Sequence, residues 1–203
     1  HDVVVPVPKG CAVTTCIMNA AWKTEYAPIM WQLPMFGAKY NETKHTWTFP
    51  NGSVQEFGHA ESEADVYNYQ SAEYQDICFD EASLFSEFQM RYMMSRCRSS
   101  LTGVKTLIRY ASNPGGPGHS FLKRRFVDPY VRHKIWKDPE SDKTMTFVPA
   151  RLHDNPALIE NNPDYVKQLK SLPEKKRLAL VDGRWDVFEG QFFPEFNEQL
   201  HVL

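Results

Sequence analysis

The sequence lacks several features that would define a class of protein. No apolar run approaches the roughly 18 residues that a membrane-spanning helix needs, and no positively charged segment followed by an apolar one stands at its beginning. None of its four cysteines belongs to a Cys-x-x-Cys pair, which argues against a zinc site and a redox motif. We therefore expect a protein with reduced thiols that is not secreted and has no membrane partner.

Arginine is absent from the first 90 residues, and charge is distributed unevenly along the chain. Residues 1–90 carry a net charge of −8, residues 91–137 carry +10, and residues 138–203 carry −4. The basic segment predicts a surface that faces an anion, and phosphate is the anion we expect. The alternative is a solvated basic face that pairs with the acidic first segment. Charge alone leaves both interpretations open.

The length of 203 residues and the hydrophobic content of 42% suit one domain, or one domain and part of another. A β-hairpin is predicted at 44–57, because Asn51-Gly52 tolerates the positive φ angles of a tight turn. Further along, short apolar runs alternate with helical patterns. Strands are expected at 77–79, 104–111 and 144–148, and helices from 86, over 120–127, from 163 and from 173 to 183. This alternation indicates an α/β sheet.

The helix expected after Ser86 has the clearest local signals. Ser86 and Gln89 form a capping box, and Phe85 can pack on Met90 at the first turn. Along the same helix, Phe85, Phe88 and Tyr92 form an apolar stripe.

Polar side chains follow two of the predicted strands. In a parallel sheet, ligands lie beyond the carboxyl ends of the strands. After the first strand, Asp80 can hold Mg²⁺ through water, and Glu81 can orient or deprotonate a water that attacks a γ-phosphate. After the second strand, the amide of Asn113 can sense that phosphate or hold the water. The alternatives are structural: the acidic pair caps the next helix, and Asn113 begins a reverse turn.

Five further stretches of the sequence form a recognisable set: Tyr69–Ala82, Arg96–Arg98, Ser112–Lys123, Phe147–Pro156 and Leu180–Phe193. Together they resemble the large terminase subunit of tailed bacteriophages, an ATP-driven DNA-packaging motor with a nuclease attached. They occur in the family's order, and the resemblance covers about residues 40 to 203.

The resemblance implies a fold and a domain organisation. It implies part of an ASCE-type P-loop ATPase sheet flanked by helices and followed by a lid and linker region. We expect residues 1–150 to form the partial ATPase domain with the hairpin, the Walker B strand and the coupling-motif strand. Residues 151–190 would form the lid and linker helices, and residues 191–203 would begin a nuclease domain.

The resemblance also implies cofactors and site residues. The cofactors would be ATP and Mg²⁺, with Asp80 as the metal ligand and Glu81 as the catalytic glutamate. Asn113 would couple hydrolysis to movement and, with Ser112, contact the nucleotide. Five basic residues would contact DNA or phosphate: Arg96, Arg98, Lys123, Arg124 and Arg125. For the first two, the alternative that we favour is pairing with the acidic segment.

The partners implied are double-stranded viral DNA, a portal protein and a small terminase subunit. Large terminase subunits of this kind assemble as a homo-oligomeric ring, and the expected location is the host cytoplasm.

One motif of such an ATPase is missing from the sequence. No glycine is followed by lysine, so the phosphate-binding Gly-x-x-x-x-Gly-Lys-[Ser/Thr] loop is absent. We therefore expect the chain to begin after that loop and after the strand that leads into it, which normally lies beside the Walker B strand. The nuclease carboxylates are likewise expected to lie beyond residue 203, and the chain alone should not hydrolyse ATP. A non-catalytic nucleic-acid-binding or partner-binding module, and an inactive prophage remnant, are the alternatives.

Overall fold

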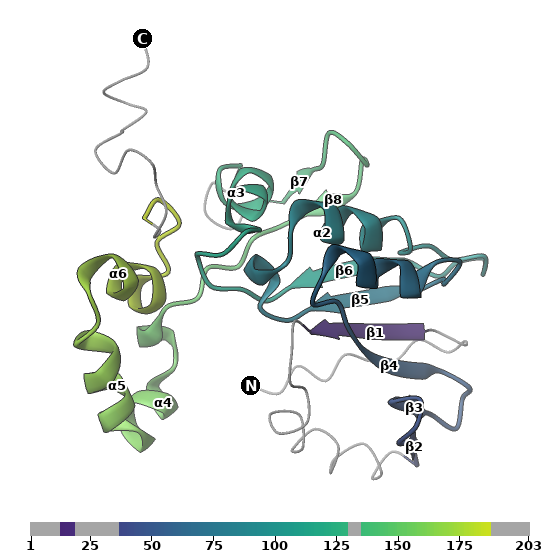
Figure 1. Ribbon diagram of the computed structural model, residues 1–203, viewed down its shortest axis with the longest axis horizontal. Helices are drawn as coiled ribbons and strands as arrows, with labels where there is room; N and C mark the ends of the chain where they lie inside the picture. Colours follow the sequence, from purple (N-terminus) through teal and green to yellow (C-terminus); the bar gives the residue numbers. More distant parts are fainter. Residues whose placement is uncertain (1–12, 19–36, 130–134, 188–203) are drawn as a thin grey trace. The chain divides into compact units, whose positions relative to one another are not determined.

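The computed structural model describes residues 13–18, 37–129 and 135–187 (Figure 1). The chain divides into two compact units, His1–Ser112 and Asn113–Leu203. The expected beginning of a nuclease domain, 191–203, lies outside the described residues, and the predicted domain boundaries at 150 and 190 stay predictions. None of the described helices has the length and apolar character needed to cross a membrane.

The first unit contains a six-stranded sheet in the order β2-β3-β4-β1-β5-β6. Strands β4, β1, β5 and β6 are mutually parallel, whereas β2 and β3 join β4 in antiparallel pairs. The strands are β1 (Val13–Met18), β2 (Lys39–Asn41), β3 (Thr46–Thr48), β4 (Val54–His59), β5 (Asp76–Phe79) and β6 (Leu107–Tyr110). The α/β fold class predicted from the sequence is confirmed.

The hairpin predicted from the sequence is formed by β3 and β4. Gly52 adopts a φ of 82° in the turn, and its N–H donates to the carbonyl of Phe49 at 2.9 Å. The side chain of Asn51 accepts the N–H of Ser53 at 3.0 Å. Asn-Gly therefore closes the turn as expected, with the positive φ confined to the glycine.

Strand β5 has a parallel neighbour on each side, β1 and β6. No pattern in the sequence predicted β1, and the missing phosphate-binding loop led us to expect an absent neighbour beside β5. The structure corrects that consequence, since both edges of β5 are paired.

Strand β6 is shorter and less buried than the strand expected at 104–111. Within its unit it is the last strand of the sheet, and Leu107 at its start is 46% exposed. It also carries Arg109, which forms an ion pair with Asp76 of β5. A charged side chain in mid-strand is compatible with a position at the margin of a sheet, not with a fully buried strand.

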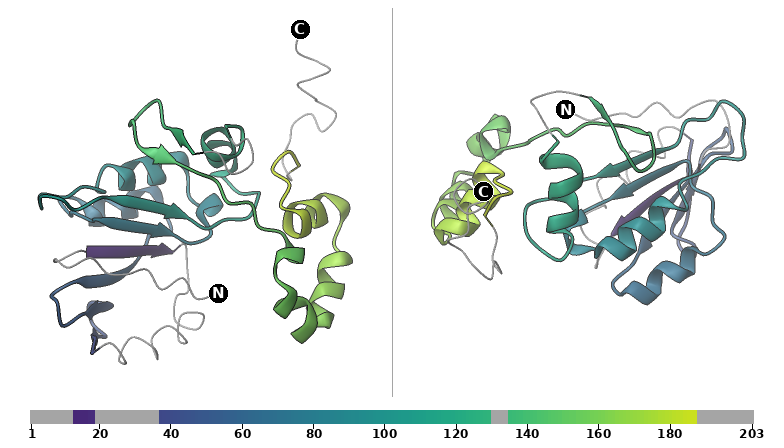
Figure 2. Two further views of the ribbon diagram at one scale, coloured as in Figure 1. Left: turned by 180° about the vertical axis from the view of Figure 1, so that it is seen from behind. Right: turned by 90° about the horizontal axis from the view of Figure 1, so that it is seen from above.

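Helix α2 (Glu87–Met94) lies beside the 3₁₀ helix η2 (Glu63–Tyr69) on one face of the sheet (Figure 2). Ser86 and Gln89 form the predicted capping box, with each side chain accepting the other residue's N–H at 3.2 and 2.8 Å. Met90 and Met93 are fully buried, and they supply the core-facing side of the helix.

The stripe of Phe85, Phe88 and Tyr92 predicted on this helix is divided in the structure. Phe85, just before the helix, is fully buried, but Phe88 is 42% exposed. Phe88 and Tyr92 instead form a cluster with Tyr67 of η2, whose ring centroid lies 5.4 Å from that of Tyr92. The two methionines and Phe85, rather than the whole aromatic stripe, therefore anchor the helix to the sheet.

Two tyrosines fix η2 and the segment after it against β4. The hydroxyl of Tyr69 donates to the carbonyl of His59 at 2.9 Å and lies where a Cβ at Gly58 would come within 2.1 Å of it. The hydroxyl of Tyr74 lies 3.3 Å from both carboxylate oxygens of Glu56, and burial raises the pKa of this carboxyl. The carboxyl end of β4 is thereby held in place.

The second unit begins with a glycine-rich loop and helix α3 (His119–Leu122), which continues as a π-helical turn, η4 (Lys123–Val127). A two-stranded ribbon, β7 (Trp136–Lys137) and β8 (Thr144–Met145), follows. The remaining elements are helical: η5 (Leu152–Asp154), α4 (Pro156–Asn161), α5 (Pro163–Lys170) and α6 (Glu174–Asp182).

The helix ends predicted in this unit are confirmed. Asn162 caps α5 by accepting the N–H of Tyr165 at 3.3 Å, and Pro163 opens the helix. Gly183 closes α6 with a φ of 63°, a left-handed conformation that glycine adopts without steric cost.

Candidate functional site

The candidate site of the first unit lies where β5 and β6 end. The acidic pair Asp80-Glu81 follows β5 directly. The N–H of Ala82 donates to the carbonyl of Ala111 at 2.8 Å, and the N–H of Ser83 donates to Oγ of Ser112 at 2.9 Å. These bonds extend the pairing of the two strands beyond their ends, so the acidic turn and Ser112 lie side by side.

Glu81 has an unusual backbone conformation. Its φ and ψ are both 47°, in the left-handed region, which costs a non-glycine residue about 1 kcal/mol or more. Such strain concentrates at functional sites, where the surrounding structure holds it. The carboxylate is exposed, and within the described residues no hydrogen bond or ion pair of this carboxylate is found.

The same turn tests the alternative that the acidic pair only caps the next helix. The short 3₁₀ helix η3 (Ala82–Leu84) begins directly after Glu81, but the Glu81 side chain makes no capping hydrogen bond to it. Helix α2 is capped by Ser86. Helix capping therefore does not account for Glu81.

The acidic pair at this edge offers carboxylates that could take part in holding a magnesium ion. No group of three or more His, Cys, Asp or Glu side chains suited to hold a metal occurs in the described ranges. Mg²⁺ usually keeps several waters and binds through one or two carboxylates together with substrate phosphates. The half-buried Asp80, next to an exposed glutamate, could supply one such carboxylate.

Asn113 follows Ser112 directly in the sequence and is the first residue of the second unit. That its side chain meets Asp80 and Glu81 stays a prediction. The loop after it is ordered within its own unit: Gly115 and Gly116 have φ angles of 119° and 76°, and the N–H of Gly115 donates to Nδ1 of His119 at 3.0 Å. His119, the first residue of α3, is thereby held by the backbone of this loop.

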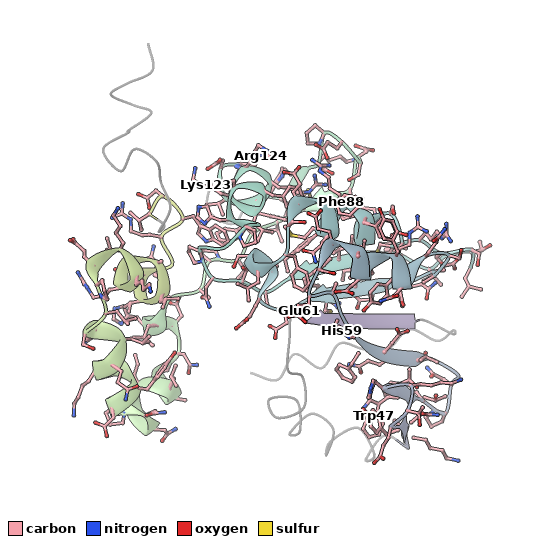
Figure 3. All side chains as sticks on the ribbon, in the orientation of Figure 1. Trp47, His59, Glu61, Phe88, Lys123 and Arg124 are labelled. Carbon is pink, nitrogen blue, oxygen red and sulfur yellow. The ribbon has the colours of Figure 1, made fainter. Side chains whose placement is uncertain are left out.

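Two polar residues at the same sheet edge were missed by the sequence analysis. His59 ends β4, and Glu61 follows it; both are exposed (Figure 3). Their position depends on the parallel pairing of β4 with β1, in which His59 lies opposite Met18. The sequence presented β4 only as the second strand of an antiparallel hairpin, so no local signal placed its end at this edge.

Of the basic residues predicted to contact phosphate, Arg96 and Arg98 follow α2. The guanidinium of Arg96 lies over the ring of Tyr92, 5.2 Å from its centroid. Arg98 donates weakly to the carbonyls of Ser71 and Ala72. Neither arginine forms an ion pair with a residue in the described part of the chain. Arg98 nevertheless interacts with Glu73 of the acidic segment: hydrogen bonds from Ser100 and, to a smaller extent, the charge of Arg98 lower the pKa of that carboxyl.

The other three basic residues lie on the π-helical turn, and they differ. Lys123 is paired with Asp128 at 2.8 Å, and Arg124 is exposed (Figure 3). The side chain of Arg125 is only 9% exposed, and its guanidinium is held by Asp138 and Glu140. Burial of this group removes Arg125 from our set of residues that contact DNA.

The sheet and its flanking helices form a mixed α/β fold, as the sequence led us to expect. A family model described as "Terminase large subunit, T4likevirus-type, N-terminal" matches residues 17–200. The chain therefore belongs to the family of phage terminase large subunits, and the resemblance noted in the sequence is confirmed.

Solved structures agree on the fold. The large terminase of a thermophilic bacteriophage, in complex with ADP, is similar with a TM-score of 0.61 and 18% identity, over 86% of this chain and 41% of that one. The same terminase in complex with ATP-gamma-S gives a TM-score of 0.58 and 18% identity, over 86% and 40%. The present chain thus spans about two fifths of that thermophilic phage protein. No curated protein matched its sequence.

Proposed function

We propose that this chain is part of the ATP-hydrolysing motor of a DNA-packaging terminase, and that the carboxyl edge of β5 and β6 carries part of its nucleotide site. The observation that supports this most is the strained turn at Glu81, tied to Ser112 at the end of the neighbouring strand. The thermophilic phage terminase, which shares the fold, has been seen with ADP and ATP-gamma-S.

In this proposal each residue of the edge has a distinct task. Asp80 would hold Mg²⁺, which when bound to ATP neutralises charge on the phosphates. Glu81 would orient the attacking water and accept its proton. Ser112 and Asn113 would face the γ-phosphate from the end of β6. Asn113 would link the loss of that phosphate to movement of the loop that follows.

The phosphate-gripping lysine loop is not among these 203 residues, because no glycine is followed by lysine. We propose that polypeptide outside them supplies it, and that the nuclease carboxylates likewise lie elsewhere. By analogy with the family, we also propose that the protein acts in the host cytoplasm as a ring of identical large subunits. Its partners there would be the portal protein and the small terminase subunit.

The proposal is tested first at the metal ligand. In the complete large subunit that contains these residues, Asp80→Asn is expected to lower ATP turnover by about 100-fold and to raise the Mg²⁺ concentration needed for half-maximal turnover, since a carboxylate ligand is lost. Phosphate release against Mg²⁺ concentration measures both. The matched control is Asp164→Asn, which changes an exposed aspartate on α5. An Asp80→Asn enzyme with unaltered turnover and Mg²⁺ dependence would refute the assignment of this edge.

We also propose that Arg124 contacts the phosphate backbone of DNA, because its exposed side chain lies on the basic turn after the glycine loop. Arg124→Gln is expected to weaken binding of double-stranded DNA at all sequences and to reduce the slope of log K against log salt by about 1. Fluorescence anisotropy at several salt concentrations measures this. Lys175→Gln on α6 is the control, and an unchanged slope in Arg124→Gln would remove this residue from the contact surface.

A further inference from the structure

The glycine loop after Ser112 is closed by its own histidine. Gly115 and Gly116 occupy backbone conformations that side chains disfavour, which lets the chain turn sharply toward α3. His119 is 3% exposed, and its Nδ1 accepts the N–H of Gly115 at 3.0 Å. The shape of the loop that begins at Asn113 therefore depends on this ring.

The imidazole ring of His119 also contacts the segment that follows α6. The rings of His119 and Trp185 stack with centroids 5.2 Å apart and planes 26° apart, and a hydrogen bond joins His119 to the backbone of Trp185. Trp185 is 8% exposed and meets the ring of Phe147 edge-on at 6.5 Å.

The segment that carries Trp185 has little room to move by itself. The N–H of Arg184 donates to the carbonyl of Leu178 in α6 at 3.1 Å. A Cβ at Gly183 would lie 2.9 Å from the carbonyl oxygen of Ala150. A shift of the glycine loop and a shift of the end of α6 are thus joined through one imidazole.

We propose that His119 is a positioning residue that couples the loop carrying Asn113 to Trp185 at the end of α6. This inference rests on the proposed function, in which Asn113 responds to the γ-phosphate, and it adds the contact through which that response would reach the helices after the site.

A neutral imidazole suits this task. It accepts a hydrogen bond at Nδ1, donates one from its other nitrogen and offers a flat face for stacking. Protonation would place a hydrogen on Nδ1 against the N–H of Gly115. Burial lowers the pKa of His119, and the hydrogen bond to the Trp185 backbone opposes this effect in part. Of the nearby charges, Lys123 lowers the pKa and Asp128 raises it. Because the pKa of His119 is lowered in the folded chain, the coupling is complete at a pH above the ordinary pKa of a histidine. It weakens as the pH falls from that pKa toward the lower pKa of the folded chain.

Hydrogen exchange of the Gly115 amide, measured by NMR on the chain of residues 1–203, tests the coupling without nucleotide. Trp185→Leu, which leaves His119 and Gly115 in place, is expected to accelerate this exchange about tenfold, as is His119→Phe, which keeps the flat ring but loses the acceptor. Trp136→Leu in β7 is the matched control and should leave the exchange unchanged.

The unsubstituted chain provides a second measurement that does not depend on how a variant folds. Relative to the intrinsic exchange rate, the Gly115 amide should lose protection as the pH falls below about 6.5, and this step should be absent in His119→Asn, whose amide oxygen accepts without titrating.

Unchanged Gly115 exchange in Trp185→Leu, or a pH step that persists in His119→Asn, would overturn the coupling. Neither readout involves ATP. If the carboxyl edge of β5 and β6 proved to have no part in ATP turnover, the exchange results would therefore still support the coupling. If the exchange results failed while that edge did take part in ATP turnover, only the coupling would be refuted.

Discussion

Arg125→Met is expected to lower the free energy of unfolding by about 3–5 kcal/mol, because it leaves a buried carboxylate without its counter-charge. The side chains of Arg125 and Asp138 are 9% and 3% exposed, so water cannot replace the lost partner. The guanidinium also lies over the ring of Phe121, 5.6 Å from its centroid. Urea unfolding followed by circular dichroism at neutral pH measures the change.

The preceding residue is a matched control. Arg124 lies on the same π-helical turn but is exposed, so Arg124→Met is expected to change the unfolding free energy by no more than about 0.5 kcal/mol. Adding Asp138→Asn to Arg125→Met should recover part of the loss, since the uncompensated charge is removed. Equal effects of the two arginine substitutions would contradict a buried ion pair.

The two arginines also mark the limit of what could be predicted from sequence. They are neighbours in a basic run, and nothing local distinguishes them. The difference comes from Asp138, which is 13 positions beyond Arg125 and lies directly after β7, in the connection between β7 and β8. A charge run therefore predicted a basic surface but not which of its members face solvent.

Features set by neighbouring residues were predicted well. The capping box at Ser86, the Asn-Gly hairpin and the glycine at the end of α6 each depend on a few consecutive residues, whose chemistry suffices. By contrast, β1 was not predicted, and the burial of α2 was divided differently from its aromatic pattern. Both depend on which distant segments pack together, and a few consecutive residues do not determine that packing.

At the candidate site, too, some features could be predicted from the sequence and others could not. The approach of the acidic turn to Ser112 could be predicted, because the ends of neighbouring parallel strands share one edge of a sheet. The left-handed conformation of Glu81 could not, since no residue near it signals a strained turn. His59 was missed because the pairing of β4 with β1 is a tertiary feature.

Glu81→Gln in the complete large subunit is expected to reduce ATP turnover by about 10²–10⁴-fold, the usual contribution of a positioned general base. Glutamine keeps the size of the side chain but does not accept the proton of the attacking water. Nucleotide affinity should stay within a few-fold of the unsubstituted protein. Steady-state phosphate release and fluorescent-nucleotide titration measure the two quantities, and Glu42→Gln, in the exposed turn between β2 and β3, is the control.

A second substitution at the same position separates the reaction from the fold. Glycine adopts a φ of 47° without the steric cost that glutamate bears there, so Glu81→Gly is expected to leave the unfolding free energy unchanged or to raise it by up to about 1 kcal/mol. Its ATP turnover should nevertheless fall as far as that of Glu81→Gln. If both variants kept normal turnover, the strained glutamate would have no part in hydrolysis, and a non-catalytic DNA-binding module would become the better account of this chain.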